Sequence, residues 1–276
     1  MSRHNISMTV GLVRSWSTRL YRLIFTSMAV GLLTGWTGQL PAWAMTSTPP
    51  HGAVQAKLDC VILLHGLART RRSMNKISEA LEKEGYRVIN QGYDSRHHAV
   101  QELAEAAISD AIGQCKSGSH SEGKIHFITH SLGGILLRQY LQRHRLEKLG
   151  RAVMLAPPNE GSEVVDRLKD VPGFDVLNGP AGRQLGTGAD DLPAQLGPFP
   201  GEVGVIAGDF SFNPILSRLI PGPDDGKVAV GRTAVAGQDD FIVLPVSHSF
   251  IMRNRTVIEQ ALHFLQHGRF DHSIKD

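Results

Sequence analysis

Apolar runs alternate with amphipathic stretches along most of the chain. Short apolar segments typical of strands occur at 60–64, 86–91, 125–129, 151–156, 203–207, 232–236 and 241–246. Helical patterns occupy the intervals near 73–84, 99–113, 134–148 and 249–266. Strands and helices in alternation build a mostly parallel sheet with helices on both faces. The pattern therefore predicts an α/β fold.

The first 44 residues have a different character. They hold four arginines and no acidic residue, an apolar run at 23–33, and then Pro-Ala-Trp-Ala at 41–44. This pattern predicts a secretory signal peptide, residues 1–44, cleaved after Ala44. The apolar run is shorter than the roughly 20 residues of a membrane span, and an uncleaved anchor is the alternative. Residues 45–276 then form a single domain, exported to the periplasm or the medium.

A serine lies where one strand is expected to turn into a helix. Residues 125–134 run from an apolar stretch through His130-Ser131-Leu132 into Gly133 and Gly134. A sharp elbow of this kind exposes the hydroxyl above a sheet, and the next N–H can face a developing oxyanion. Thr129 departs from the G-x-S-x-G pattern, and the alternative interpretation is an ordinary turn without a catalytic function. The chemistry indicated is acyl transfer.

Three further segments supply partners in the order nucleophile, acid, histidine that α/β-hydrolases require. An apolar strand at 60–64 ends in His65-Gly66. Downstream, Asp225-Gly226 forms a tight turn that carries a carboxylate. Further on, the apolar run 241–246 leads to His248 in a loop. Together these segments indicate a catalytic serine site far more specifically than any one of them does alone.

With these motifs, residues 58–268 resemble the α/β-hydrolase superfamily, in its small lipase and esterase branch. The resemblance implies the α/β-hydrolase fold, with Ser131 as nucleophile, His248 as general base and Asp225 as the residue that orients it. It also implies an oxyanion hole formed by the backbone N–H groups of Leu67 and Leu132. The Gly- and Pro-rich stretch 157–201 lies where this fold inserts a cap, and its length allows one or two short helices, such as 161–169.

Other residues compete for the roles of acid and base. Asp224 adjoins Asp225, which is favoured because the Asp-Gly step carries the acid in similar lipases. Two other aspartates, at 239 and 240, precede the last strand too closely to reach back. Of the thirteen histidines, His65 and His130 are expected to pack around the loops.

The combination predicts a serine hydrolase that cleaves carboxylic esters, with lipid acyl esters among the candidate substrates, through an acyl-enzyme on Ser131. The same residues would also serve thioesters, amides or acyl transfer to an alcohol, and residue types alone do not separate these reactions. A non-catalytic binding protein on a hydrolase scaffold, or another α/β fold, remains open because of Thr129.

The charge balance restricts the classes of partner that the sequence supports. The chain has 29 Lys and Arg against 26 Asp and Glu, but the predicted leader holds four of the basic residues, which leaves 25 against 26 and a net charge of −1. This balance gives no case for nucleic-acid binding. Three arginines follow the expected oxyanion loop closely enough to meet an anionic substrate or an anionic headgroup during transient contact with a membrane surface, although such clusters are commonly only solvated. They are Arg69, Arg71 and Arg72.

Cys60 and Cys115 are the only cysteines, at the start of an expected strand and the end of an expected helix. They can form a disulfide in an oxidising compartment or remain two buried thiols. Zinc-ligand spacing, phosphate-binding glycine loops and dinucleotide fingerprints are missing from the sequence, which therefore implies no metal and no cofactor.

Overall fold

The computed structural model of the protein describes residues 59–117 and 122–273. The predicted signal peptide, 1–44, and its cleavage point lie outside these residues. The described part contains a six-stranded sheet in the order β2-β1-β3-β4-β5-β6, and every neighbouring pair is parallel. Its strands are β1 Cys60–Leu64, β2 Arg87–Gln91, β3 Ile125–His130, β4 Leu149–Leu155, β5 Val203–Gly208 and β6 Asp240–Leu244.

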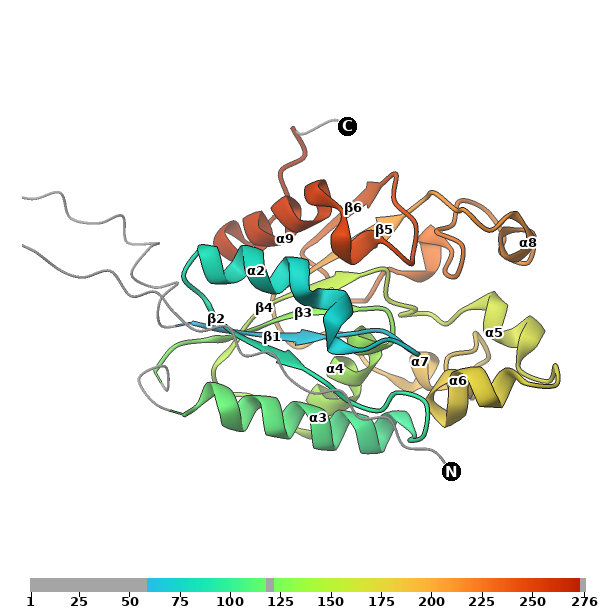
Figure 1. Ribbon diagram of the computed structural model, residues 1–276, viewed down its shortest axis with the longest axis horizontal. Helices are drawn as coiled ribbons and strands as arrows, with labels where there is room; N and C mark the ends of the chain where they lie inside the picture. The colour runs from blue at the N-terminus through green and yellow to red at the C-terminus, as the bar shows by residue number, and fades with distance from the viewer. Residues whose placement is uncertain (1–58, 118–121, 274–276) are drawn as a thin grey trace, which may run out of the picture. The chain divides into compact units, whose positions relative to one another are not determined.

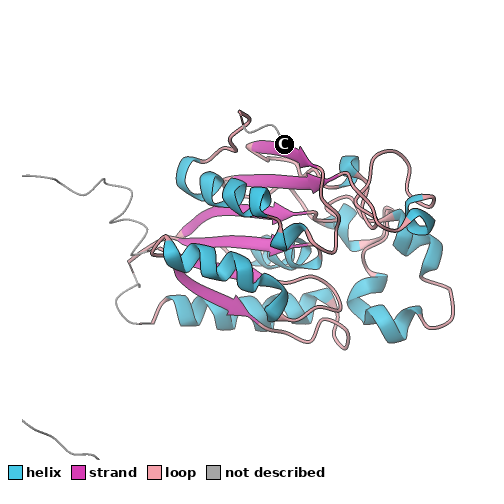
Figure 2. Ribbon diagram, turned by 45° about the horizontal axis from the view of Figure 1, so that its top comes forward, coloured by secondary structure: helices cyan, strands magenta, loops and turns pink. Residues whose placement is uncertain are grey.

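Helices cover both faces of the sheet (Figure 1). On one face lie α2 and α9, and on the other lie α3 and α4. Further short helices lie beyond the carboxyl ends of the strands, which the arrowheads mark in Figure 2. The helix bounds are α2 Asn75–Lys83, α3 Val100–Cys115, α4 Leu132–Arg143, α5 Glu163–Leu168, α6 Phe174–Arg183, α7 Leu192–Gln195, α8 Pro214–Ser217 and α9 Arg255–His267. The predicted α/β class is confirmed.

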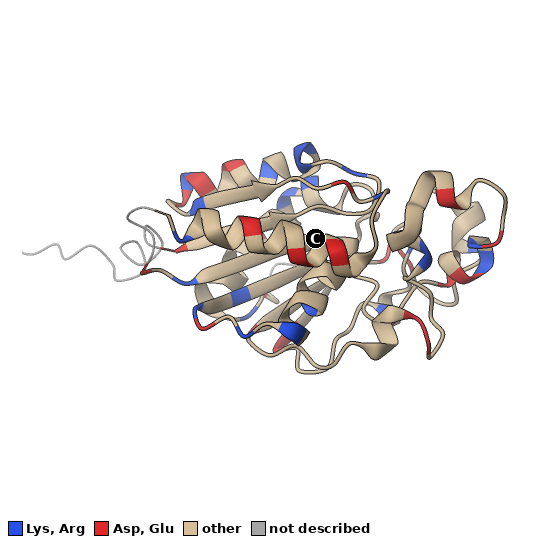
Figure 3. Cartoon of the chain, turned by 90° about the horizontal axis from the view of Figure 1, so that it is seen from below, with Lys and Arg blue, Asp and Glu red and all other residues tan. Residues whose placement is uncertain are grey.

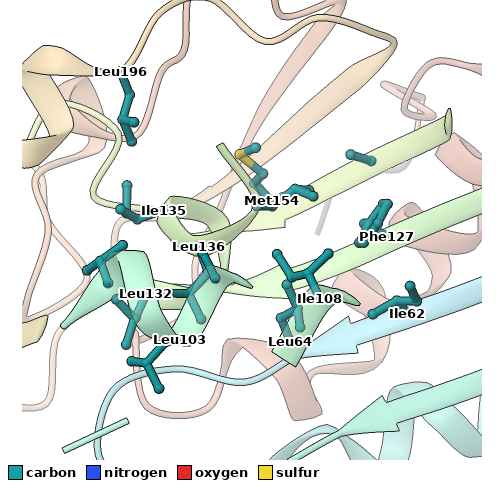
Figure 4. Close-up of a cluster of buried hydrophobic side chains, with 14 of the residues drawn as sticks. Ile62, Leu64, Leu103, Ile108, Phe127, Leu132, Ile135, Leu136, Met154 and Leu196 are labelled. Atoms are coloured by element: carbon teal, nitrogen blue, oxygen red, sulfur yellow. The ribbon is translucent and has the colours of Figure 1, made fainter. Parts of the chain in front are cut away.

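Side chains of the central strands alternate between two apolar clusters, one on each face. In β1, Ile62 and Leu64 pack with α3 and α4, whereas Val61 and Leu63 pack with α2 and α9. Figure 4 shows part of the first cluster, which also includes Phe127 of β3. Successive strand residues point to opposite faces, and a strand covered on both faces must be apolar throughout. This explains why the central strands read as continuous apolar runs.

One predicted strand is wrong and several helix bounds shift. Residues 232–236 do not join the sheet, and the 3₁₀ turn η4 Val230–Arg232 leads into them. Their backbone bonds to loops and side chains instead, because the Thr233 carbonyl accepts from Asn159 Nδ2 at 2.8 Å and Val235 N–H donates to Gln238 Oε1 at 3.0 Å. The last helix begins at Arg255, after the predicted 249, because the Asn254 side chain caps it by accepting from Val257 N–H.

The chain between β4 and β5 forms a cap of three short helices, α5, α6 and α7. Helix α6 is kinked at Gly179, whose φ of 62° lies in the left-handed region. A Cβ at Gly179 would lie 1.7 Å from the carbonyl oxygen of Arg96, so only glycine permits this approach of the cap to the loop after β2. The cap is thereby fixed against the loops that follow the strands.

A disulfide joins Cys60, the first residue of β1, to Cys115, the last residue of α3. The two Cα atoms are 5.8 Å apart, and the cysteines are separated by 55 positions in the sequence. The bond therefore lies at the end of the sheet where the parallel strands begin.

Reduction of this disulfide, or the double change Cys60→Ser and Cys115→Ser, should lower the free energy of unfolding by about 2–4 kcal/mol. The reason is that a closed loop of this length restricts the unfolded chain. Urea unfolding with and without reductant measures the effect. Identical midpoints for the oxidised and reduced protein would contradict the expectation.

Among the described residues, no helix is long and apolar enough to cross a membrane. The sheet order places the carboxyl ends of β1 and β3 side by side at the point where successive connections leave in opposite directions. Ligands of open α/β sheets bind at the carboxyl ends of strands next to such a switch point. A ligand site is therefore expected at the loops after β1 and β3.

Candidate active site

Ser131 lies between β3 and α4 in a backbone conformation that residues other than glycine rarely adopt. Its φ is 52° and its ψ is −119°. The N–H of Ser131 donates to the carbonyl of Leu155 at 2.9 Å, and its own carbonyl accepts from Gly134 N–H at 2.9 Å. These bonds hold the strained turn against the end of β4. The Ser131 side chain consequently lines a pocket at the carboxyl edge of the sheet.

Two glycines of α4 allow the helix to approach the sheet despite Thr129. A Cβ at Gly133 would lie 2.6 Å from the Leu64 carbonyl oxygen, and one at Gly134 would lie 3.1 Å from Pro157 Cβ and 3.4 Å from Thr129 Oγ1. Thr129 is fully buried, and its hydroxyl oxygen has no hydrogen-bond partner among the described residues. The β-branched residue therefore fits because the helix presents glycine toward it.

The structure brings the three predicted triad residues together. His248 Nε2 lies 3.0 Å from Ser131 Oγ, and His248 Nδ1 lies 2.7 Å from Asp225 Oδ2. All three side chains are buried. This network suits the neutral tautomer in which Nδ1–H donates to the carboxylate and Nε2 accepts from the serine hydroxyl. In that form an imidazole can take the proton of the serine.

The loop after β6 presents His248, and the turn after α8 presents Asp225. His248 N–H donates to the Asp225 carbonyl at 2.9 Å, so backbone and side chain both join the two loops. The second carboxylate oxygen of Asp225 accepts from the N–H groups of Lys227 and Val228 at 3.0 and 2.9 Å. Both oxygens are thus occupied, which fixes the plane of the carboxylate.

The competing aspartates have other partners. Asp224 Oδ1 accepts from Ser217 Oγ at 2.8 Å and from Gly226 N–H at 2.7 Å, and so stabilises the turn that carries Asp225. Asp239 accepts from Val203 N–H at 2.7 Å. Asp240 accepts from Phe270 N–H at 2.7 Å. Only Asp225 bonds to His248 among these four carboxylates.

The loop after β1 lies directly against the serine. A Cβ at Gly66 would be 3.2 Å from Ser131 Cβ. The N–H groups of Leu67 and Leu132, the predicted oxyanion donors, donate no hydrogen bond to another group of the described chain. Leu132 is the first residue of α4, where backbone N–H groups have no partner within the helix. Both donors are therefore free to bind an oxygen of a ligand.

Residues after β2, which the sequence did not single out, hold this loop in place. Ser95 Oγ accepts from Ala68 N–H at 3.0 Å, and Tyr93 donates from its hydroxyl to the His65 carbonyl. The rings of His65 and Tyr93 stack with their centroids 3.9 Å apart. Burial lowers the pKa of His65, which favours a neutral ring in this position. No motif marked Ser95 or Tyr93, because their contact depends on the pairing of β1 with β2.

His130 packs against the loop that carries His248, as expected, and forms no hydrogen bond with Asp225 among the described residues. Its Nε2–H donates to the His248 carbonyl at 3.0 Å, whereas its Nδ1 is buried without a partner among the described residues. Burial, and then the neighbouring His248, hold the pKa of His130 well below its usual value of 6.5. His130 is therefore neutral in the folded protein at neutral pH.

The stability of the protein should accordingly fall as the pH drops below about 6.5. The unfolded chain takes up a proton at His130 in this range and the folded chain does not, so protonation favours unfolding by about 1 kcal/mol between pH 6.5 and pH 5.5. Urea unfolding across this range measures the slope. His130→Gln, which retains a donor, should reduce it. An unchanged slope in His130→Gln would refute the explanation.

A pocket of about 360 Å³ opens beside Ser131 and His248. Its walls are mainly apolar, and most come from the cap: Val164, Val165, Leu168, Val171, Phe174, Leu177 and Leu185. Leu67 and Leu216 add apolar surface from the loop after β1 and from α8. An apolar cavity with a few convergent polar groups is typical of small-molecule sites. Among the described residues, no group of three or more His, Cys, Asp or Glu could hold a metal ion.

Comparison with known proteins agrees with this geometry. The model of the palmitoyl protein thioesterase family matches residues 60–186, which include Ser131 but neither Asp225 nor His248. The mature form of lipase BlEst2 from Bacillus licheniformis superposes with a TM-score of 0.62 at 18% identity, covering 75% of this chain and 91% of that chain. No curated protein sequence matches the chain.

Two larger proteins also share the fold. Aspergillus fumigatus lipase B has a TM-score of 0.58 at 15% identity, covering 79% of this chain and 55% of that chain. Phospholipase PlaB from Legionella pneumophila has a TM-score of 0.54 at 20% identity, covering 64% of this chain and 45% of that chain. The chain thus spans about half the length of these two. Sheet order, elbow and structural matches together show that the protein has the α/β-hydrolase fold.

Proposed function

We propose that the protein is a serine hydrolase that cleaves acyl esters, with Ser131 as nucleophile, His248 as general base and Asp225 as the orienting acid. The observation that carries this proposal is the buried chain of hydrogen bonds from Ser131 Oγ through both nitrogens of His248 to Asp225. A serine hydroxyl becomes a competent nucleophile when a neutral, correctly oriented imidazole accepts its proton. The pocket beside it supplies the space for a substrate.

In the proposed reaction, Ser131 Oγ attacks the carbonyl carbon and its proton passes to His248 Nε2. The N–H groups of Leu67 and Leu132 stabilise the oxyanion of the tetrahedral intermediate. His248 then protonates the departing alcohol, which leaves an acyl group on Ser131. Water, deprotonated by His248, releases the acid and restores the serine.

The apolar cap favours an alkyl chain on the acyl side. Two exposed apolar side chains line the pocket, Val171 just before α6 and Leu177 on α6. Phe212 and Ile215 are exposed just before and on α8, which supplies the pocket residue Leu216. Exposed apolar groups clustered around a pocket are typical of sites that meet apolar or membrane-associated ligands. We therefore include lipid acyl esters among the substrates, with transient contact between this rim and a lipid surface. The charge balance gives no reason to propose a nucleic-acid partner.

Thioesters are the second candidate substrate. The specific observation in their favour is the match of residues 60–186 to the palmitoyl protein thioesterase family. The triad chemistry is the same for both classes, since only the leaving group changes from an alcohol to a thiol. Acyl transfer to an alcohol would use the same acyl-enzyme.

Hydrolysis of matched substrates tests the proposal. Octanoyl esters and octanoyl thioesters with the same remaining structure should both be compared by kcat/KM, along with acetyl and palmitoyl esters. We expect esters to be cleaved, and longer chains to be favoured over acetyl because more apolar surface is buried in the pocket. An absence of turnover on every ester and thioester by folded protein would contradict the proposed function.

We also propose that the protein is exported, on the strength of the leader pattern at residues 1–44. All three tryptophans, at positions 16, 36 and 43, lie within this leader. Protein recovered from the periplasm or medium of expressing bacteria should therefore emit only tyrosine fluorescence. Tryptophan emission from that material would show that the leader is retained.

A further inference from the structure

Two cationic side chains line the pocket in which Ser131 and His248 meet. They are Arg69, two residues after Leu67, and Lys227, two residues after Asp225. No carboxylate is among the residues that line this pocket. In the described part of the chain, neither the guanidinium of Arg69 nor the ammonium of Lys227 forms an ion pair or a hydrogen bond with a protein side chain. The carboxylate that acts on the charge of Lys227 is that of Asp225, which already bonds to His248. Their charges are thus available to a ligand.

The loops that position the reacting groups also position these two cations. The backbone N–H of Lys227 donates to Asp225 Oδ1 at 3.0 Å, and its carbonyl accepts from Ser162 Oγ of the cap at 2.7 Å. Arg69 N–H donates to the Gly66 carbonyl at 3.3 Å, which closes the turn that presents Leu67. Each cation is therefore connected through a short, hydrogen-bonded segment to the triad or the oxyanion loop.

Arg69, Lys227 and Ser131 line one pocket, and the two cations act on each other electrostatically. Burial, and then the charge of Arg69, lower the pKa of Lys227, whereas the charge of Asp225 raises it; the Lys227 side chain still reaches solvent. Arg69 and Lys227 both lower the pKa of His130, the neighbour of Ser131. Two like charges in a concave, mainly apolar site raise each other's free energy, and an anion between them relieves that repulsion.

Arg69 and Lys227 are not part of a larger basic surface. In Figure 3, basic and acidic residues are interspersed over the helices and loops of the described chain. Arg71 and Arg72, which follow Arg69 in the sequence, are exposed and do not line the pocket. The attraction for an anion is therefore local to the pocket.

We propose that Arg69 and Lys227 form a cationic subsite for a phosphate group in the leaving-group part of the substrate. The subsite rests on the proposed function, and it narrows the substrates to acyl esters whose alcohol carries a phosphate close to the scissile bond. The acyl chain occupies the apolar walls of the cap, so the phosphate belongs to the opposite side of the ester. The guanidinium of Arg69 can bind two phosphate oxygens, and Lys227 adds a point charge.

A pair of substrates that differ only in the phosphate tests the subsite. These are 1-octanoylglycerol and 1-octanoylglycerol 3-phosphate, which have the same scissile ester. For the full-chain protein we expect kcat/KM to be at least about 10-fold higher for the phosphate ester at low salt, because each charged hydrogen bond lost or gained changes binding by this order. The preference should shrink as salt is added.

Variants then assign the preference to the two residues. Arg69→Met and Lys227→Met should each lower the ratio of the two kcat/KM values by about 10-fold. Arg69→Lys and Lys227→Arg should retain most of it, since the charge remains. Arg72→Met, which removes the same charge outside the pocket, should leave the ratio unchanged. Thermal unfolding of each variant confirms that it is folded.

The other possible results distinguish failure of the subsite from failure of the proposed hydrolase function. Equal rates on the two esters in the wild-type protein, or an undiminished ratio in both methionine variants, would overturn the subsite and leave the proposed hydrolase function intact. Failure to hydrolyse either ester, together with every other ester and thioester, would overturn the function and the subsite with it. The octanoyl ester of 2-hydroxyethyl phosphate, which has a phosphate close to the scissile ester but no glycerol backbone, separates the sources of phosphate. Its cleavage with the same dependence on Arg69 and Lys227 assigns the subsite to any phosphate near the ester, whereas a dependence confined to the glycerol phosphate ester assigns it to glycerol-based lipids.

Discussion

Ser131→Ala should lower kcat/KM on ester substrates by about 10⁴-fold to 10⁶-fold, because the proposed mechanism makes and breaks a covalent bond to Ser131 Oγ. No other hydroxyl lies within hydrogen-bond distance of His248 Nε2 in the described residues. The loss should appear in kcat, since the pocket that binds the substrate is unchanged. Steady-state hydrolysis of a chromogenic ester measures it.

Folding should be almost unaffected by Ser131→Ala. The hydroxyl contacts His248 at the pocket and contributes little to core packing, so the urea midpoint should remain near that of the wild type. The triad acts as a unit, and the double change Ser131→Ala and His248→Ala should be scarcely less active than either single change. Wild-type activity in folded Ser131→Ala would remove the serine from the mechanism.

The second large effect concerns the acid. Asp225→Asn should lower kcat by about 10⁴-fold, because an amide in place of Oδ2 no longer holds Nδ1–H of His248 in the required tautomer. Asp224→Asn should have a far smaller effect on kcat, since Asp224 bonds to Ser217 and Gly226 and not to the imidazole. The comparison uses adjacent residues and the same isosteric change.

The matched pair separates chemistry from turn stability. Loss of a hydrogen bond at Asp224 should lower the free energy of unfolding by about 1 kcal/mol while kcat stays within about 10-fold of the wild type. Denaturant unfolding and steady-state kinetics on both variants supply the two readouts. Equal and mild losses of kcat would mean that neither carboxylate orients His248.

Local patterns were sufficient to predict much of the fold. The apolar runs that became β1, β3 and β5 are buried on both faces of a parallel sheet, which leaves few positions for polar side chains. The strand predicted at 232–236 failed because apolar residues there pack into a loop whose backbone bonds to Asn159 and Gln238. A short apolar run does not reveal where its backbone hydrogen bonds will go.

The elbow and the proposed triad residues could be selected from sequence because each follows a strand and carries a recognisable residue type. Between Asp224 and Asp225 the sequence offered only a preference, and the contact with His248 distinguishes them. The positioning residues Tyr93 and Ser95 gave no signal, since their contacts with the loop after β1 arise from strand pairing. The pairing of Arg69 with Lys227 in one pocket likewise depends on loops distant in the sequence.

Strain and packing at the elbow have a direct chemical consequence. The positive φ of Ser131 is held by hydrogen bonds to β4 and α4, and the glycines of α4 allow a helix to begin immediately after it. The free N–H of Leu132 is thereby placed next to the hydroxyl. A donor fixed before the reaction requires no rearrangement when negative charge develops.

Labelling with a fluorophosphonate probe tests directly whether Ser131 is an activated nucleophile, because such probes react with serines activated by a neighbouring base. The purified wild-type chain and Ser131→Ala are incubated with the probe, and the modified peptide is identified by mass spectrometry. The account predicts a single labelled site at Ser131, absent from the variant and strongly reduced in His248→Ala. Folded wild-type protein that remains unlabelled, or labelling that persists in Ser131→Ala, would contradict it.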